Sequence, residues 1–352
     1  MSPNAIVAMS GGVDSSVAAA LLSEEGFAVT GITMQLHSCS REKDRSCCSA
    51  RDRMDARAVC ERLGIGLKVI DLRGRFREFV VEPFVEEYLA GRTPSPCVRC
   101  NELIKFPVLL AEAMDEGACA FATGHYARVA RDGDIVRLLK ARDTEKDQSY
   151  FLFCLTQDIL GRLRLPLGEM TKEEVRSFAR ARGLPVHEKA ESQEICFVTD
   201  DDYAGFVECR ASERLGGPGD FVDSDGAPLG RHRGIHAYTI GQRRGLGIGG
   251  GPRRYVVGID RGANTVTLGA DEELMRERLS VGSASWIHPS FARSRDVTVK
   301  IRSTHSGEDA RISPVDGGRV DVEFARPVRA IAPGQAAVFY DGDEVIGGGW
   351  IE

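Results

Sequence analysis

The chain contains 352 residues, of which 42% are hydrophobic and 28% charged, and its formal net charge is −6. This length is sufficient for two or three domains with separate cores. No apolar stretch follows a basic N-terminal region, and no run of about 18 apolar residues occurs, so the composition argues against a secreted or membrane protein and predicts a cytoplasmic one. We therefore expect the ten cysteines to be buried hydrophobic residues, metal ligands or reactive thiols rather than a disulfide framework.

Strand and helix patterns alternate in the first half of the chain. Strands are expected over residues 5–8, 28–34, 66–72 and 118–123, and helices over residues 15–25, 51–63 and 107–116. The last of these helices has a proline in its first turn. Repeated β-α-β units predict an α/β fold with a doubly wound parallel sheet, whose ligands bind at the carboxyl ends of the strands. Ser10 and Gly124 both fall at such ends.

The second half of the chain has a different pattern. Residues 128–139 predict an inserted hairpin, and residues 171–182 predict a helix opened by a capping box. After residue 196 the chain is rich in glycine and strand-like, with one helical pattern near 271–278. From residue 280 onward, alternating runs predict a small C-terminal β-barrel. The expected domains are residues 1–204, a small central domain of residues 205–279, and residues 280–352.

A loop of glycine and serine joins the first strand to the first helix, with the sequence Ser10-Gly11-Gly12-Val13-Asp14-Ser15-Ser16. Paired glycines let the backbone approach an anion, and the helix that follows offers N–H groups and a positive dipole end. No lysine follows the glycines, so this is not a Walker loop. It is the pattern of the PP-loop ATP pyrophosphatases, which have the adenine nucleotide hydrolase-like fold. An ordinary strand-turn-helix junction would need neither the aspartate nor the serines. We expect the loop to hold the pyrophosphate of ATP, with Asp14 helping to place Mg²⁺.

Positive charge is concentrated between residues 228 and 262. Seven arginines stand there against one acid, Asp260, a local balance of +6 in an acidic chain: Arg231, Arg233, Arg243, Arg244, Arg253, Arg254 and Arg261. This concentration is typical of a surface that contacts nucleic-acid phosphates. A solvated face without a partner is the alternative, and charge alone does not separate the two.

Three cysteines accompany these features. Cys97 and Cys100 have C-x-x-C spacing in a proline-containing loop, and Cys196 follows later. Further motifs occur in order along the chain: Gly91-Arg92-Thr93-Pro94, Gly124-His125-Tyr126, Lys146-Asp147-Gln148-Ser149-Tyr150, Tyr238-Thr239-Ile240-Gly241-Gln242-Arg243-Arg244-Gly245-Leu246 and Gly347-Gly348-Gly349. Together they closely resemble the tRNA-specific 2-thiouridylases over the whole chain. Enzymes of that family use ATP to adenylate the C2 oxygen of the wobble uridine, and sulfur then displaces AMP.

The resemblance implies a set of contacts. Those with ATP would be made by Ala8, Met9, Ser10, Gly11, Gly12, Val13, Asp14, Ser15, Met34 and Gly124. Those with tRNA would be made by Ser95, Pro96, Cys97, His125, Lys146, Asp147, Gln148, Arg302, Ser303 and Gln335. The anticodon base must leave its stack to reach such a pocket. The partner that supplies sulfur would be a cysteine desulfurase or a sulfur-relay protein.

The chain departs from the common family pattern at two positions. Cys97 stands where an aspartate is usual, and Ser95 stands in place of an asparagine. In the aspartate form, the residue matching Cys196 carries a persulfide, and the residue matching Cys100 releases the sulfur by forming a disulfide bond. With a third cysteine, Cys97, Cys100 and Cys196 could instead hold an iron-sulfur cluster, [4Fe-4S], whose open iron binds sulfide. We favour the cluster, and the persulfide route is the alternative.

Two other functions compete with this interpretation. The first is another PP-loop ligase, such as an ammonia-using synthetase, and the second is a non-catalytic RNA-binding protein that senses nucleotide or redox state. Cys60, Cys119 and Cys154 are expected in the core. Cys39, Cys47 and Cys48 lie in a polar segment with poor geometry for zinc. The sequence does not indicate a role for Cys209.

Overall fold

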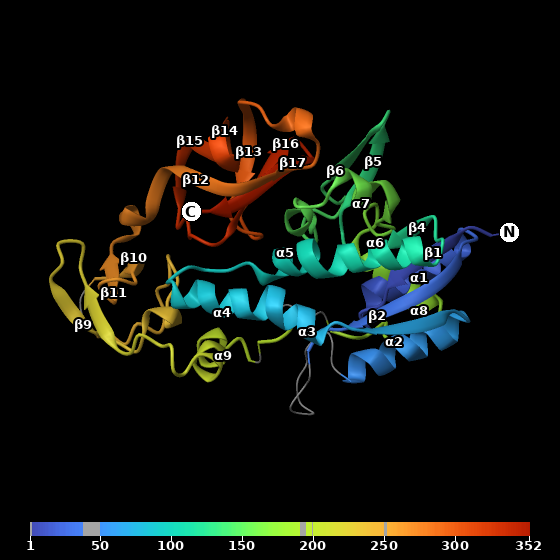
Figure 1. The fold of residues 1–352 in the computed structure, drawn as a ribbon, viewed down its shortest axis with the longest axis horizontal. Helices are drawn as coiled ribbons and strands as arrows, with labels where there is room; N and C mark the ends of the chain where they lie inside the picture. Colours follow the sequence, from blue (N-terminus) through green and yellow to red (C-terminus); the bar gives the residue numbers. More distant parts are fainter. Residues whose placement is uncertain (1, 38–49, 191–194, 199, 250–251) are drawn as a thin grey trace.

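The described part of the chain forms three β-sheets (Figure 1). The computed structural model describes residues 2–37, 50–190, 195–198, 200–249 and 252–352. The N-terminal sheet lies at one end of the molecule and the small middle sheet at the other. Long helices run between these two ends, and the C-terminal sheet lies beside them. Among the described helices, none combines the length and apolar content that crossing a membrane requires.

The N-terminal sheet has five parallel strands in the order β3-β2-β1-β4-β7. These strands are β1 (Asn4–Ala8), β2 (Ala28–Gln35), β3 (Gly66–Asp71), β4 (Ala120–Ala122) and β7 (Leu163–Arg164). The helices around them are α1 (Val13–Glu24), α2 (Ala50–Leu63), α6 (Phe106–Asp115), α7 (Gln157–Arg162) and α8 (Lys172–Ala181). Because the chain winds outward from β1 in both directions, the predicted doubly wound sheet is confirmed.

Alternate residues of β1 face two different cores, as a sheet covered on both sides requires. Ala5 and Val7 belong to a cluster formed with α1, α2 and α8, whereas Ile6 belongs to one formed with α6 and α7. The capping box predicted at the start of α8 is present, with Thr171 and Glu174 bonded reciprocally. The sheet is therefore a rigid platform with the glycine-serine loop at its edge.

The helix predicted over residues 107–116 begins earlier than expected. It continues backward from α6 through a π-helical turn, η2 (Asn101–Lys105), to α5 (Pro96–Cys100). A second π-helical turn, η1 (Arg77–Val81), lies between α3 (Arg73–Phe76) and α4 (Glu82–Leu89). Each π turn directly precedes a helix with proline at its second residue, Pro83 or Pro107. Proline lacks an N–H and crowds the preceding turn, and the widened turn accommodates it without ending the helix.

The small middle sheet has the order β10-β11-β8-β9. Its strands are β8 (Gly219–Val222), β9 (Pro228–His232), β10 (Tyr255–Asp260) and β11 (Thr265–Gly269), preceded by α9 (Tyr203–Arg210). The prediction of a helix near residues 271–278 is wrong. A short 3₁₀ turn, Asp271–Leu274, leads directly into a strand that starts at Met275. Met275 pairs with Arg329, so cross-strand pairing overrides the local helical pattern.

The C-terminal sheet closes into the predicted barrel. Its strands run in the order β12-β15-β14-β13-β16-β17, and β12 also pairs with β17. They are β12 (Met275–Trp286), β13 (Arg295–Lys300), β14 (Glu308–Val315), β15 (Arg319–Arg329), β16 (Ala336–Asp341) and β17 (Glu344–Ile351). The predicted hairpin is present as β5 (Arg128–Asp132) and β6 (Ile135–Leu139), and β6 extends the barrel sheet along β17.

The predicted cysteine positions are partly correct. Cys60 and Cys154 are buried as expected, whereas Cys119 is exposed. Cys119 lies one residue before β4, where its thiol donates to the Asn4 carbonyl at the sheet edge, 3.3 Å away. Cys209 is exposed on α9. The segment containing Cys39, Cys47 and Cys48 lies outside the described residues.

Candidate functional site

The glycine-serine loop turns sharply between β1 and α1. Gly11 has φ +75°, and a Cβ there would fall 2.2 Å from the Asp52 carbonyl oxygen, so only glycine fits. Gly12, the N-cap residue of α1, has no side chain with which to bond the first-turn amides. A helix start of this kind can bind an anion through its N–H groups.

Serine hydroxyls fix the shape of this loop. Ser10 donates its N–H to Ser15 Oγ at 3.2 Å, and the hydroxyls of Ser15 and Ser16 donate to the Gly12 carbonyl at 3.2 and 2.8 Å. Ser16 is fully buried, whereas Ser10 is exposed. Ser16 therefore has a structural role, and Ser10 is accessible to a ligand.

Gly124 closes the loop from a neighbouring strand. It follows β4, and a Cβ there would fall 2.6 Å from the Ser15 amide nitrogen. The two segments that the sequence places at strand ends, Ala8–Ser15 and Gly124, are therefore in contact. Met34 lies on the adjacent strand, β2, and is half-buried.

Two lysines that the sequence analysis did not single out contact the loop. Lys172 Nζ, at the start of α8, lies 2.8 Å from both carboxylate oxygens of Asp14, and the Tyr126 hydroxyl donates to the same carboxylate at 2.9 Å. Lys189 Nζ donates to the Gly11 carbonyl at 2.9 Å and to the Asp52 carboxylate at 2.6 Å. Both lysines are far from the loop in the sequence, and each stands alone in a polar stretch. No motif spacing therefore marked them as site residues.

Asp14 fits the requirements of a magnesium ligand. Its side chain is 31% exposed at the edge of the loop. Mg²⁺ at nucleotide sites takes one or two carboxylates, with phosphates and water completing the shell. A single aspartate beside an anion-binding helix start meets that need, although its ion pair with Lys172 must be shared or rearranged when the metal binds.

His125 lies beside Phe106, with ring centroids 5.7 Å apart, and its Nδ1 is 2.8 Å from Thr123 Oγ1. Burial, and to a smaller extent the charge of Lys105, holds the pKa of His125 well below its usual range. The ring is therefore neutral at physiological pH. It suits hydrogen bonding to a base rather than charge pairing with a phosphate.

The segment after the hairpin is held by its own side chains. Gln148 accepts the Tyr126 N–H at 3.0 Å, and Asp147 accepts the Ala141 N–H at 2.9 Å and the Ser149 hydroxyl at 2.8 Å. Asp147 and Gln148 therefore order this loop, and Lys146 beside them is half-buried.

Cys97 and Cys100 both lie on α5, which Ser95 and Pro96 open, but their exposure differs. Cys97 is exposed, and Cys100 is 8% exposed. Cys196 is half-buried and packs against the same apolar cluster as Cys100. Met34 of β2 also packs against that cluster. Cys100 and Cys196 thus share one apolar cluster, next to the strand that borders the glycine-serine loop.

The predicted iron-sulfur cluster receives no support from this arrangement. Among the described residues, which include all three of these cysteines, no group of three or more histidine, cysteine, aspartate or glutamate side chains could hold a metal ion. Cys97 is exposed while Cys100 is buried, so the two residues of this helix differ in their access to a ligand. A [4Fe-4S] cluster needs its cysteine thiolates on one centre. The described residues show no such centre, and the cluster stays a prediction without support from the structure.

The predicted tRNA contacts of the barrel lie in two loops. Gln335 donates its amide to the carbonyls of Thr93 and Pro94, at 3.1 and 3.0 Å. Arg302 is half-buried, and burial together with Arg329 lowers its pKa. Ser303 beside it is exposed.

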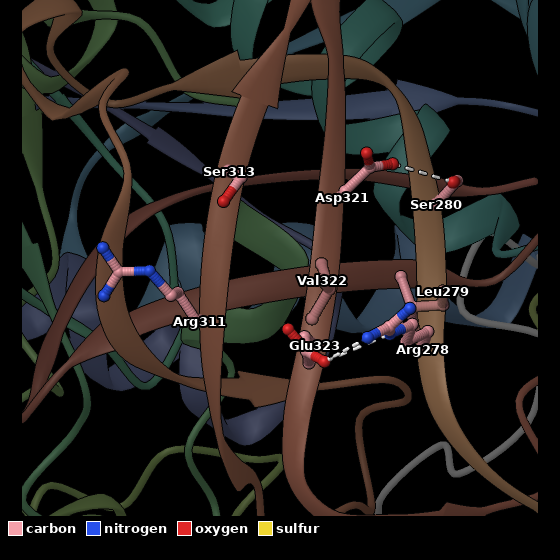
Figure 2. Close-up of a pocket in the computed structure, with 8 residues that line it drawn as sticks. All are labelled: Arg278, Leu279, Ser280, Arg311, Ser313, Asp321, Val322 and Glu323. Atoms are coloured by element: carbon pink, nitrogen blue, oxygen red, sulfur yellow. Dashed lines mark hydrogen bonds and ion pairs between the residues drawn. The ribbon is translucent and has the colours of Figure 1, made fainter.

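A separate depression lies on the barrel, away from all of these residues (Figure 2). It has a volume of about 620 Å³ and is lined by strands β12, β14 and β15. Arg278 pairs there with Glu323, and Ser280 donates to Asp321. Its charges are balanced and none of its residues is a predicted site residue, so it is not part of the candidate site.

Comparison with known proteins settles the family. Models described as the tRNA methyl transferase HUP domain, the tRNA methyl transferase PRC-barrel domain and the aminomethyltransferase beta-barrel domain match residues 3–200, 205–270 and 276–351. A tRNA-specific 2-thiouridylase MnmA of Geobacter metallireducens is 49% identical over 99% of this chain and 96% of its own. The chain belongs to the tRNA-specific 2-thiouridylase family. Further members from Chloroflexus aggregans and Acidithiobacillus ferrooxidans are 50% and 47% identical over 99% of this chain and 98% of theirs. The resemblance that the motifs predicted is confirmed.

Proposed function

We propose that this chain is an ATP-dependent tRNA uridine 2-sulfurtransferase that thiolates the wobble uridine. The observation that carries this proposal is the shared cluster of Cys100, Cys196 and Met34 beside the glycine-serine loop. Family relatives named tRNA-specific 2-thiouridylases, matched over nearly the whole chain, support it. An ammonia-using synthetase would have no need for this pair of thiols. A non-catalytic redox sensor would use them, and tRNA-dependent pyrophosphate release separates it from the enzyme.

The first step is adenylation of the uridine C2 oxygen, which attacks the α-phosphorus of ATP and releases pyrophosphate. The residues that hold ATP are Ala8, Met9, Ser10, Gly11, Gly12, Val13, Asp14, Ser15, Met34 and Gly124. Met9 and Val13 are buried and act through their backbone. Asp14 orients Mg²⁺, which neutralises phosphate charge when bound. Lys172 and Lys189 hold the loop and supply positive charge beside it.

The second step transfers sulfur. Cys196 carries a persulfide supplied by a cysteine desulfurase or a sulfur-relay protein, and its outer sulfur attacks C2 and displaces AMP. The Cys100 thiolate then attacks the inner sulfur, so that the S–S bond to the nucleoside breaks and a disulfide bond forms between the two cysteines. The transferred sulfur is reduced, the two thiols are oxidised, and an external thiol restores them. We prefer this route to the cluster because the described residues contain no group of cysteine, histidine or acidic side chains that could hold a metal ion.

The tRNA lies across all three domains in this proposal, which we assign to residues 1–204, 205–279 and 280–352. Contacts are made by Ser95, Pro96, Cys97, His125, Lys146, Asp147, Gln148, Arg302, Ser303 and Gln335. Neutral His125 and the start of α5 face the base. Exposed Arg243 and Arg244 of the central domain contact phosphates. The place of action is the cytoplasm, where tRNA and ATP are available.

The test is to separate the two steps. Cys196→Ala should form no 2-thiouridine, yet should release pyrophosphate from ATP when tRNA is present. Thiolation near the wild-type rate would refute the role of Cys196. Pyrophosphate release without any dependence on tRNA would favour a different PP-loop enzyme, and absence of release in the wild-type protein would favour a non-catalytic sensor.

A further inference from the structure

The cysteine-bearing helix α5 is in direct contact with the β-barrel. Arg99 lies between Cys97 and Cys100 in the sequence, and its guanidinium carbon lies 4.2 Å from the centroid of the Trp350 ring. Trp350 belongs to β17, the last strand of the barrel. An arginine stacked on an aromatic face is attracted by the ring quadrupole, so this contact orients the helix relative to the barrel.

A second contact buries the same helix turn. Val98, also between the two cysteines, is fully buried and belongs to one hydrophobic cluster with Ala336 and Val338 of β16. Rotation or translation of α5 would therefore disturb a core that is shared with the barrel.

A third contact fixes the loop that leads into α5. Thr93 donates its N–H to the Pro333 carbonyl at 2.8 Å, and Gln335 donates to the carbonyls of Thr93 and Pro94. Gly334 has φ +89°, and a Cβ there would fall 2.9 Å from the Thr93 carbonyl oxygen. The barrel loop thus approaches the backbone as closely as glycine permits.

The nucleotide loop is held by different elements. Its contacts with Lys172, Lys189, Asp52 and Gly124 come from the N-terminal domain. A disturbance at the barrel contact therefore acts directly on the helix that carries the thiols, and reaches the nucleotide loop only through the core against which Ala8 and Met34 pack.

We infer that the β-barrel positions the cysteine helix for sulfur transfer, with Arg99 and Trp350 as positioning residues and Gln335 holding the loop before them. This inference rests on the proposed function. Adenylation depends on this contact less than sulfur transfer does, because the nucleotide loop is held by other elements. The barrel thus does more than bind tRNA, because it sets the place from which sulfur is delivered.

The test uses Arg99→Met, Trp350→Leu and the double variant in single-turnover assays at saturating tRNA. Because a misplacement of about 1 Å can cost about 100-fold in rate, we expect thiolation to slow by roughly 10- to 100-fold in each single variant. Because the start of α5 also faces the base, pyrophosphate release should slow as well, but by less than about threefold and so far less than thiolation. If the two side chains act through each other, the double variant should be no slower than the worse single variant. Trp350→Phe, which keeps an aromatic face, should restore most of the rate.

A matched control is Tyr255→Leu, because Arg329 of β15 stacks on Tyr255 of β10 at 5.0 Å and so joins the barrel to the central domain rather than to α5. This variant should thiolate saturating tRNA at the wild-type rate. Unchanged thiolation in Trp350→Leu, or an equal loss of pyrophosphate release, would overturn the inference and leave the proposed function intact.

Amide hydrogen exchange of residues 93–100 gives a readout that needs no activity. Exchange should be faster in Trp350→Leu than in the wild-type protein, and unchanged exchange would overturn the positioning role. Absence of thiolation by the wild-type enzyme would instead overturn the proposed function. The exchange result would still show whether Trp350 holds residues 93–100 in place.

Discussion

Replacing Lys172 with methionine tests how the nucleotide loop is organised. The side chain of Lys172 is 11% exposed and that of Asp14 is 31% exposed, and the two form an ion pair at 2.8 Å. Without the ammonium group, the carboxylate keeps the Tyr126 hydroxyl at 2.9 Å. Breaking a buried pair costs about 3–5 kcal/mol, whereas an exposed pair contributes about 0–1 kcal/mol. Because this pair lies between those limits, we expect the free energy of unfolding to fall by about 1–3 kcal/mol.

The effect of Lys172→Met on catalysis should be larger than its effect on stability. Loss of one preorganised positive group beside the reacting phosphates should slow tRNA-dependent pyrophosphate release by about 100- to 1,000-fold. The assay is single-turnover pyrophosphate release, with urea unfolding measured in parallel. Lys68→Met is the control, because Lys68 is 44% exposed and pairs with Glu116 away from the loop. A Lys172→Met protein that is folded and releases pyrophosphate at the wild-type rate would refute this account of the loop.

Two further predictions concern tRNA affinity and pH. Replacing both Arg243 and Arg244 with alanine should weaken tRNA binding and leave ATP binding unchanged. The slope of log affinity against log salt concentration should fall by about one to two units. An unaltered slope would show that neither arginine contacts a phosphate. Because burial lowers the pKa of His125 from its usual 6.5, the unfolded state binds more protons below that pH, and stability should fall as the pH is lowered. Urea unfolding measures this effect: below about pH 6.5, the free energy of unfolding should fall less steeply with pH in His125→Gln than in the wild-type protein or in His288→Gln on the barrel. The same dependence on pH in all three proteins would contradict a neutral His125 ring.

The sequence predicted best what depends on short segments. The loop from Ser10 to Ser16 has a fixed spacing because one turn must join one strand to one helix, and the structure contains that turn. The capping box at Thr171 is equally local. Lys172 and Lys189 were missed because their roles arise only when the fold brings them to the loop, and nothing in their neighbours indicates that contact.

The errors have physical causes as well. Pro107 marked a helix start in the sequence, but a π-helical turn lets the helix continue back to Pro96. A helix was predicted over residues 271–278 because a local sequence pattern does not reveal pairing with β15, which is distant in the sequence. The iron-sulfur prediction differs from these two, because it is unsupported rather than wrong: the described residues contain no group that could hold a metal ion.

The most direct test of the central claim is to incubate iron-free protein with ATP, Mg²⁺, unmodified tRNA, a cysteine desulfurase and cysteine, and to measure 2-thiouridine by mass spectrometry. The account predicts one 2-thiouridine at the wobble position for each pyrophosphate and each AMP released. Pyrophosphate release without thiolation, with thiolation appearing only after iron and sulfide are restored, would contradict the thiol route. Absence of both products would contradict the assignment of the enzyme itself.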